Sequence, residues 1–447
     1  MEIKLPENVR KVIGVLEQNG YEGYAVGGCV RDSILGRVPN DWDITTSASP
    51  MQVKSLFPRT VDTGIQHGTV TVLMGREGYE VTTYRLDGEY EDCRHPREVM
   101  FTSSLTEDLR RRDFTINAMA YNDSHGLVDI FGGKEDMKNN VIRCVGNAEE
   151  RFHEDALRIL RAVRFSAQLG FAVEEKTADA IRKLAPNLNQ ISAERIQTEL
   201  VKLLTSPHPD YLGLAWEYGI TAVILPEFDR TMETPQNNPH HCWSVGIHTL
   251  ETLKNTENEK CLRLAALFHD FGKPLVRTTD ENGIDHFYGH AKVSCELAAD
   301  ILHRLKFDND TIRRVKLYVN YHDVRPELTE KSVRRAVSRI GAENFAEILK
   351  LKAADTLAQS PERQLEKKEY LCSLTQLYRR ILEKKQCLTI RDLAVNGRDL
   401  IADGMQPGRE LGTVLGGLLE YVLENPECNK RETLLVCSRR IRENGTV

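Results

Sequence analysis

The chain has 447 residues, of which 28% are charged, and a formal net charge of −6. This length exceeds one ordinary hydrophobic core and predicts two to four domains, and the mild acidity means that any nucleic-acid surface must be a local basic patch. Because we find neither a secretory leader nor an apolar run of about 18 residues, we predict a cytoplasmic protein without membrane association.

The first 145 residues mix helix and strand patterns, and from about residue 105 onward the chain is predicted to be mainly helical. Apolar spacing and glycine positions predict a helix over 7–19, a strand at "YAVGG" (24–28), a helix at "VRDSILG" (30–36), a strand at "DWDIT" (41–45) and a hairpin over 68–85. Because side chains alternate along a strand, Asp41 and Asp43 are expected on one face.

Asp41 and Asp43 have the spacing of a magnesium-binding pair. Two carboxylates at i and i+2 of a strand emerge on the same side and can both ligate Mg²⁺. Such a pair suits a two-metal site, in which one ion activates a hydroxyl and the other neutralises a triphosphate. Upstream, Gly27 and Gly28 let the backbone approach phosphate oxygens, and the following helix offers its N-terminus to the same anion. Taken alone, each feature also fits solvated aspartates or an ordinary turn.

The segment "RRRDFTINAMAY" (110–121) places a basic cluster directly ahead of a predicted helix that contains Asn117. Arg112 and Asp113 within it also fit an ordinary surface ion pair.

The segment "HEDALRILRAVRF" (153–165) is predicted as one helix, with its leucines and valine on the buried side. Asp155 and Arg158 are three residues apart and are therefore expected on the same helix face. In isolation this pair also fits an intrahelical salt bridge.

Five motifs occur together in a characteristic order: "GGCVRDSILGRVPNDWDI", "RRDFTINAMA", "DIFGGKEDMKNNVIRCVG", "EDALRILRAVRF" and "ISAERIQTELVKLL". They resemble the bacterial class II transfer RNA nucleotidyltransferases and the related bacterial poly(A) polymerases, densely over residues 20–205. The resemblance implies an α+β fold: an N-terminal polymerase-β-like palm, with a mixed sheet and helices, followed by mostly α-helical neck, body, HD and tail domains. It also implies Mg²⁺, CTP, ATP and transfer RNA as ligands, and no protein partner is predicted.

The resemblance assigns roles to individual residues. Asp41 and Asp43 are the expected catalytic carboxylates that bind Mg²⁺. Glu80, in the predicted hairpin, lies where a third carboxylate would approach the metals. The expected nucleotide-binding residues are Gly27, Gly28, Arg31, Asp32, Arg112, Asn117, Glu154, Asp155, Arg158 and Arg161.

Asp155 and Arg158 also explain how C and A can be selected without a nucleic-acid template. Cytosine and adenine both present an amine donor beside a ring-nitrogen acceptor, whereas uracil and guanine present a carbonyl beside an N–H. A carboxylate that accepts from the amine and a guanidinium that donates to the ring nitrogen therefore suit C and A.

The polar segment 86–101 is expected to take part in the switch from C to A. In the resembling family, enzymes that add only the two cytidines have a shortened or altered version of this segment. Here it has full length and includes Asp92, Arg94 and Pro96. This favours A addition as part of the activity.

A second pattern, H…HD…D, lies downstream. His248 is followed by the dyad His269–Asp270 at the end of an apolar helix, and later by His322 and Asp323 in "NYHDVRP". Imidazoles and carboxylates together suit a divalent metal that activates water against a phosphate ester.

This pattern resembles the HD superfamily of metal-dependent phosphohydrolases. The resemblance makes His290 and Lys273 candidates for phosphate-binding or supporting groups, and the residues leave open whether His322 or Asp323 reaches the metal. We expect hydrolysis of small phosphoesters such as 2′,3′-cyclic nucleotides; a purely structural domain is the alternative. The expected ligands of this divalent metal, whose identity is not predicted, are His248, His269, Asp270 and Asp323.

Polar stretches divide the chain into four predicted domains. The last one includes the segment 388–426, which resembles the C-terminal segment of the same family, and its basic side chains fit either RNA contact or a solvated helix face. The predicted domains are the nucleotidyltransferase head (1–145), a helical nucleotide-recognition neck and body (146–235), an HD phosphohydrolase-like domain (236–360) and a helical tail (361–447).

The predicted function is the addition of C, C and A to the 3′ end of transfer RNA by two-metal nucleotidyl transfer with release of pyrophosphate. Poly(A) synthesis and the addition of A alone use almost the same motifs and remain alternatives. A phosphohydrolase whose N-terminal half only holds RNA, or an RNA-binding protein without activity, is disfavoured because both Asp41 and Asp43 are intact.

Overall fold

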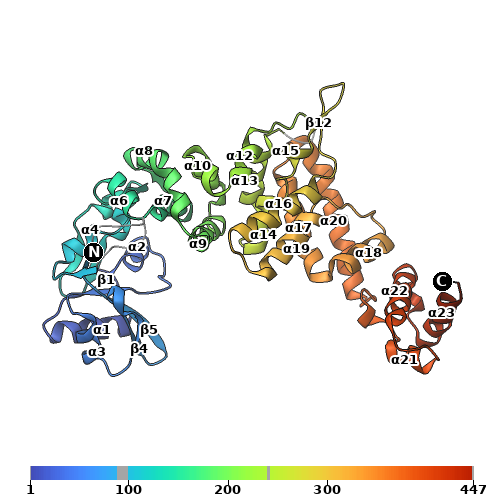
Figure 1. Ribbon diagram of the computed structural model, residues 1–447, viewed down its shortest axis with the longest axis horizontal. Coiled ribbons are helices and arrows are strands. Elements are labelled where there is room, and N and C mark those ends of the chain that lie inside the picture. The colour runs from blue at the N-terminus through green and yellow to red at the C-terminus, as the bar shows by residue number, and fades with distance from the viewer. Residues whose placement is uncertain (1, 88–98, 239–241, 445–447) are drawn as a thin grey trace. The chain divides into compact units, whose positions relative to one another are not determined.

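The computed structural model describes residues 2–87, 99–238 and 242–444 (Figure 1). The chain forms two compact units, residues 1–229 and 230–447. The predicted boundary near 235 lies close to this division, whereas the predicted boundaries near 145 and 360 lie inside the units. Asp92, Arg94 and Pro96 fall outside the described residues.

The first unit is built on a seven-stranded mixed sheet with the strand order β3-β4-β5-β2-β1-β8-β9. β2 and β5 are parallel, and the other neighbours are antiparallel. The strands are β1 (Gly23–Val26), β2 (Ile44–Thr46), β3 (Thr60–Gly64), β4 (Thr69–Met74), β5 (Glu77–Thr83), β8 (Met119–Asn122) and β9 (Gly126–Asp129). The predicted strand at 24–28 and the hairpin over 68–85 are confirmed.

Two predictions about this region are wrong. The helix predicted around Asn117 is not formed: Met119–Asn122 is the fully buried strand β8 beside β1, because tertiary burial of a small and aromatic run outweighs local helical preference. The strand β2 begins only at Ile44, so Asp41 and Asp43 lie in the segment that leads into it.

Helices and short pairs complete the head. α1 packs on β1 and β2, and α3 packs on β4 and β5. The predicted helices at 7–19 and 30–36 are confirmed as α1 and α2. The elements are α1 (Glu7–Gln18), α2 (Gly28–Ile34), α3 (Pro50–Leu56), α4 (Leu105–Arg110), α5 (Gly133–Lys138), the pair β6 (Arg85–Asp87) and β7 (Val99–Phe101), the pair β10 (Val141–Ile142) and β11 (Ala172–Val173), and the 3₁₀ turns η1 (Ile65–His67) and η2 (Thr115–Asn117).

Short helices follow the sheet in the same unit. The predicted single helix over 153–165 is wrong, because the chain breaks between α6 and α7 at Asp155, whose side chain accepts a hydrogen bond from Leu157 N at 3.1 Å. α7 is buried along nearly its whole length, including Arg158 and Arg164. The elements are α6 (Ala148–Glu154), α7 (Leu157–Leu169), α8 (Glu175–Leu184), η3 (Ala185–Gln190), α9 (Ala193–Leu204), η4 (Pro209–Tyr211), α10 (Leu212–Glu217), α11 (Thr221–Ile224) and α12 (Pro226–Glu233).

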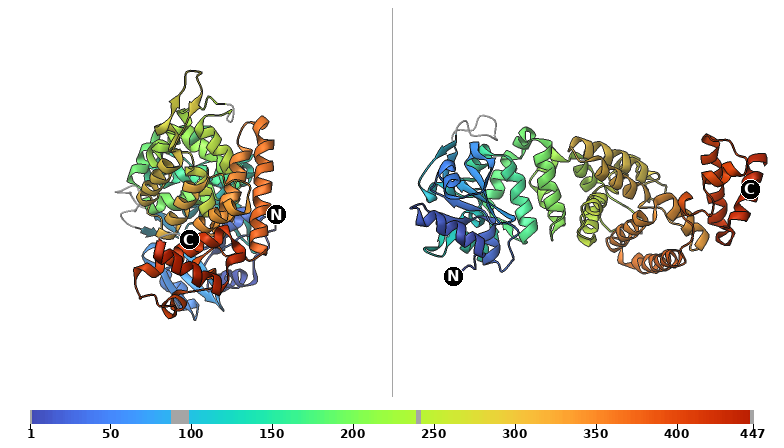
Figure 2. Two further views of the ribbon diagram at one scale, coloured as in Figure 1. Left: turned by 90° about the vertical axis from the view of Figure 1, so that its right-hand side faces the viewer. Right: turned by 90° about the horizontal axis from the view of Figure 1, so that it is seen from below.

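In its described residues, the second unit consists of helices and one short strand pair (Figure 2). Its last three helices enclose a separate apolar core around Val414, Leu418 and Leu434. Among the described helices, none combines the length and apolar character needed to cross a bilayer. The elements are α13 (Val245–Asn255), α14 (Lys260–Phe268), α15 (Lys273–Val276), β12 (Thr278–Thr279), β13 (Asp285–His286), α16 (His290–Arg304), α17 (Asn309–Tyr321), α18 (Glu330–Ile340), α19 (Ala342–Leu357), α20 (Pro361–Glu383), η5 (Ile390–Asp392), α21 (Gly397–Ala402), α22 (Arg409–Glu424), η6 (Pro426–Cys428) and α23 (Arg431–Asn444).

Candidate functional sites

The residues expected to bind metal and nucleotide meet at one edge of the sheet. β1 ends at this edge, and its antiparallel neighbours β2 and β8 begin there. Gly27 and Gly28 follow β1, and Asp43 directly precedes β2, with its carbonyl accepting a hydrogen bond from Val26 N at 3.0 Å. The sheet therefore places the glycines expected to contact phosphate beside the aspartate expected to bind metal.

Three carboxylates gather on the metal side. Glu80 lies in β5, the parallel neighbour of β2. The pKa of Asp43 is raised by desolvation of its carboxyl group, then by the charge of Asp41, and also by Glu80, while Arg112 opposes the shift. Because a divalent cation would relieve this repulsion between like charges, the three side chains fit Mg²⁺.

Gly27 and Arg112 form the phosphate side. Gly27 has a φ of +81°, and a Cβ at this position would lie 3.0 Å from Arg112 Nη1, so no other residue fits here without strain. Arg112 Nε is buried and has no hydrogen-bond partner among the described residues, and the ion pair of Arg112 with Asp108 is long, at 3.6 Å. A guanidinium with an unpaired N–H beside a glycine suits an anionic ligand.

The remaining head residues join one hydrogen-bond network. Arg31 binds Asp32 through Nε at 2.9 Å and Nη2 at 3.0 Å, and donates from Nη1 to Asn117 Oδ1 at 2.7 Å. Asn117 donates to Asp113 Oδ1 at 3.1 Å, and Arg161 Nε donates to Asp113 Oδ2 at 2.8 Å. The possibility that Asp113 belongs to a surface pair is therefore wrong: it is buried and links α2, η2 and α7.

The side chains of Arg158 and Asp155 are held by contacts with different residues. Arg158 donates to Glu154 Oε2 at 2.7 Å and to the carbonyl of Arg111 at 3.0 Å. Asp155 Oδ2 accepts from Arg195 Nη2 at 2.7 Å. Arg158 forms an ion pair with Glu154, and Arg195, which the sequence reasoning did not single out, anchors Asp155.

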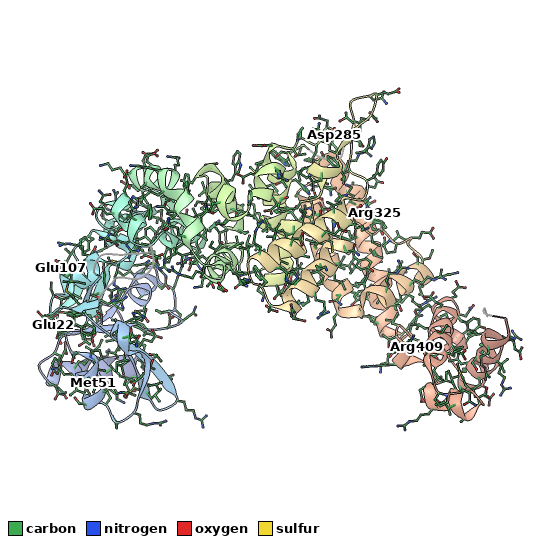
Figure 3. All side chains as sticks on the ribbon, in the orientation of Figure 1. Glu22, Met51, Glu107, Asp285, Arg325 and Arg409 are labelled. Atoms are coloured by element: carbon green, nitrogen blue, oxygen red, sulfur yellow. The ribbon has the colours of Figure 1, made fainter. Side chains whose placement is uncertain are left out.

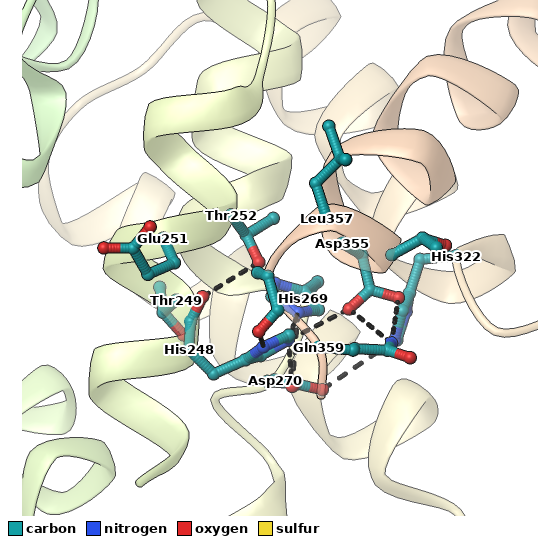
Figure 4. A network of polar contacts seen from close by, with 12 residues as sticks. His248, Thr249, Glu251, Thr252, His269, Asp270, His322, Asp355, Leu357 and Gln359 are labelled. Atoms are coloured by element: carbon teal, nitrogen blue, oxygen red, sulfur yellow. Dashed lines mark hydrogen bonds and ion pairs between the residues drawn. The ribbon is translucent and has the colours of Figure 1, made fainter. Parts of the chain in front are cut away.

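In the second unit, imidazoles and carboxylates from separate helices converge in a buried cluster (Figure 4). His248 lies in α13, His269 and Asp270 follow α14, His290 begins α16 and His322 directly follows α17. We call this group the histidine cluster: His248, His269, His290, His322, Asp270 and Asp355 of α19.

The main correction concerns Asp323, which was predicted to be a metal ligand. Asp323 is exposed and lies in neither of the two groups of convergent ligand atoms, whereas its neighbour His322 is buried, with Nε2 3.8 Å from Asp270 Oδ1. Asp355 was missed, although its Oδ1 lies 2.9 Å from His248 Nε2. The signal in the sequence was an aspartate among the leucines and alanines of "LKAADTLA" (351–358).

The ionisable side chains of the histidine cluster shift one another's pKa values. Burial and then the nearby His269 lower the pKa of His322 to about 3. Burial alone would raise the pKa of Asp270, but His269 and Lys273 hold it well below its ordinary value, and Lys273 Nζ lies 2.7 Å from Asp270 Oδ2. The cluster therefore combines an ionised carboxylate with a neutral imidazole, the donor set of a divalent metal. Arg325, labelled in Figure 3, and Lys367 line the adjoining cavity of about 420 Å³.

The most informative solved relative is the CCA-adding enzyme of Bacillus stearothermophilus, known in complex with CTP. It matches with a TM-score of 0.74 and 30% identity over 98% of both chains. Family models describing the poly A polymerase head domain and tRNA nucleotidyltransferase domain 2 match residues 23–143 and 277–437.

The CCA-adding enzyme of Lactobacillus helveticus is 39% identical over 94% of this chain and 94% of its own length. This chain belongs to the CCA-adding enzyme family. The CCA-adding enzyme of Lactiplantibacillus plantarum is 36% identical over 97% of this chain and 96% of its own. The Thermotoga maritima CCA-adding enzyme complexed with tRNA shares the fold, with a TM-score of 0.59 at 21% identity. The predicted α+β nucleotidyltransferase fold of this chain is confirmed.

Proposed function

We propose that this CCA-adding enzyme completes transfer RNA in the cytoplasm by adding C, C and then A from CTP and ATP. The observation that carries the proposal is the juxtaposition of three carboxylates, Asp41, Asp43 and Glu80, with Gly27 and Arg112 at one sheet edge. The names of the relatives, and the CTP complex of the Bacillus enzyme, support the same reaction.

In this reaction the terminal ribose hydroxyl of the RNA attacks the α-phosphorus of the nucleotide. The new P–O bond forms as the bond to the β-phosphate oxygen breaks, the hydroxyl proton passes to water, and pyrophosphate leaves. Mg²⁺ held by Asp41 and Asp43 would promote deprotonation and neutralise the triphosphate. Gly27 leaves room for a phosphate oxygen, and Arg112 supplies positive charge beside it.

Base selection falls to Asp155 and Arg158. Each carboxylate oxygen has two lone pairs, so Asp155 can accept from a base amine while it stays bound to Arg195. Arg158, fixed by Glu154, keeps its guanidinium in one orientation for a ring nitrogen. These prior contacts reduce the side-chain entropy that base recognition costs.

Replacing Asp43 tests the transfer site. Asp43→Ala should abolish incorporation of labelled CTP and ATP into transfer RNA, while circular dichroism and the thermal unfolding midpoint stay close to those of the parent. Incorporation at the parent rate would remove Asp43 from the reaction.

We also propose that the histidine cluster binds a divalent metal and hydrolyses phosphate esters such as 2′,3′-cyclic nucleotides. The supporting observation is the convergence of buried imidazoles on Asp270, beside a cavity lined by Lys273, Arg325 and Lys367. Water adds to phosphorus, one ring P–O bond breaks, and the leaving oxygen takes a proton. Asp270→Asn should leave transfer intact and abolish release of the nucleoside monophosphate; unchanged release would refute this activity.

A further inference from the structure

Two aromatic rings lie together at the cavity beside the histidine cluster. His286 ends β13, Tyr288 follows two residues later, and both line the cavity of about 420 Å³. The angle between their ring planes is 5°, and the ring centroids are 5.5 Å apart. Tyr288 is 81% exposed, the highest value of any phenylalanine, tyrosine or tryptophan in the described part of the chain. We call His286 and Tyr288 the aromatic pair: His286 stacks on one face of the Tyr288 ring, and the high exposure leaves the opposite face open to a ligand.

Polar contacts hold the aromatic pair on the hairpin of β12 and β13, which stands clear of the neighbouring helices (Figure 1). His286 Nε2 lies 3.0 Å from Asp280 Oδ2, and the Tyr288 hydroxyl lies 3.5 Å from His286 Nδ1. In β13, the buried Asp285 accepts a hydrogen bond from Thr279 Oγ1 of β12 at 2.7 Å. A ring held by such contacts loses little side-chain entropy when a ligand stacks on it.

The same cavity carries three cationic side chains, those of Lys273, Arg325 and Lys367. Ammonium and guanidinium groups bind phosphate oxygens, and an exposed aromatic face binds a nucleobase by stacking. A nucleotide has both a phosphate group and a base. A sugar phosphate or a glycerol phosphate has only the first, so it would leave the exposed ring of Tyr288 without a partner.

We propose that the aromatic pair binds the nucleobase at this cavity, so that the substrates of the second unit are nucleotides and not phosphate esters in general. The base stacks on the open face of Tyr288, and the phosphate group faces the three cations. The inference rests on the proposed hydrolysis and deepens it, because it names the substrate class and the residues that select it. Since every base has a π face, the pair selects nucleotides without choosing strictly among bases.

Binding of a fluorescent nucleotide to the full-length chain tests the aromatic pair. The probe is ethenoadenosine 3′-monophosphate, whose etheno bridge blocks the base edge that Asp155 and Arg158 are proposed to recognise in the first unit. In fluorescence anisotropy, Tyr288→Ala should weaken binding about tenfold, and Tyr288→Phe, which keeps the ring, should change it less than about twofold. Leu275→Ala is the matched control, because Leu275 is 56% exposed and is not among the described residues that line the cavity.

Hydrolysis separates the aromatic pair from the reaction. Tyr288→Ala should raise KM for 2′,3′-cyclic AMP about tenfold at an unchanged kcat. It should leave hydrolysis of glycerol 1,2-cyclic phosphate, which has the same phosphate ring without a base, at the parent rate. Because Tyr288 is exposed, the thermal unfolding midpoint of the variant should equal that of the parent.

The outcomes distinguish this inference from the proposed hydrolysis. Equal affinity of the parent and Tyr288→Ala for the probe, no binding by the parent, or an equal loss of activity on both esters would overturn the role of the aromatic pair. Binding that depends on Tyr288, without hydrolysis of either ester by the parent, would uphold the base-binding role and refute only the hydrolysis.

Discussion

Replacing Asp113 tests the network that ties the nucleotide-binding residues of the head to α7. Its Oδ1 accepts from Phe114 N at 2.8 Å and from Asn117, and its Oδ2 accepts from Arg161. Asp113→Asn keeps the shape but removes the charge and turns an amide toward the guanidinium of Arg161. Breaking a fully buried ion pair costs about 3–5 kcal/mol, and an exposed pair contributes about 0–1 kcal/mol.

The ion pair between Asp113 and Arg161 is neither fully buried nor fully exposed, so its contribution lies between these two values. The Asp113 side chain is 8% exposed and the Arg161 side chain 31% exposed. Arg161 also keeps a weaker contact with Glu199 at 3.7 Å and reaches some solvent. We therefore expect Asp113→Asn to destabilise the first unit by about 2 kcal/mol, a value between the buried and exposed limits.

The pH dependence of this loss identifies its cause. Burial would raise the pKa of Asp113, but the charge of Arg161 and the hydrogen bond from Asn117 lower it well below its ordinary value. A lowered folded-state pKa stabilises the fold above the unfolded value of about 4, and this contribution disappears as the pH falls through the folded value. The difference between parent and variant should therefore be full at pH 6 and shrink below pH 4.

Fluorescence during urea unfolding can report the first unit alone. The three tryptophans are Trp42, Trp216 and Trp243, and Trp243→Phe at an exposed position leaves the two of the first unit. Asp179→Asn, in an exposed pair with Arg182, is the matched control and should cost at most about 0.5 kcal/mol. A loss for Asp113→Asn no larger than that of the control, or a loss that is constant from pH 6 to pH 3, would refute the reasoning.

Further substitutions test the two sides of the same site. Gly27→Ala should lower single-turnover CTP incorporation at least tenfold because of its φ of +81° and the crowding of Arg112; an unchanged rate would contradict the close approach of phosphate. Arg195→Gln should lower the preference for CTP over UTP by about tenfold, a loss of about 1.4 kcal/mol, because Asp155 loses its anchor; competition between the two nucleotides measures it, and unchanged selectivity would remove Arg195 from this role. Glu80→Gln should raise the Mg²⁺ concentration needed for half-maximal transfer, because a carboxylate beside Asp43 is lost.

Features that depend on short stretches of chain could be predicted from the sequence. The turn at Gly27 and the approach of Asp41 and Asp43 to the sheet edge follow from glycine and aspartate within one strand–helix–strand segment. The location of Glu80 also follows, because it lies on a regular hairpin whose register the alternation sets.

Features that depend on distant partners could not be predicted in this way. Asp113 resembles a surface residue until Arg161, 48 positions later, is packed against it. Asp155 interrupts a regular helical pattern because its side chain accepts a hydrogen bond from Leu157 N and binds Arg195 in α9. Tertiary contacts determine the burial of Asp113 and the helix break at Asp155, and the local sequence pattern does not show these contacts.

The error at Asp323 has a geometric cause. His322 directly follows α17 and is buried, whereas its neighbour Asp323 is exposed, and both line the cavity beside the cluster. The aspartate of the pattern is supplied instead by α19, through Asp355.

The central claim is that one active site adds C, C and A in order, and incorporation into transfer RNA that lacks its 3′ terminus tests it most directly. Labelled CTP alone should add two residues, ATP alone should add none, and both together should add C, C and a single A. A run of A would instead identify poly(A) synthesis, and A addition only to RNA that already ends in CC would identify an A-adding enzyme; either result would contradict the account.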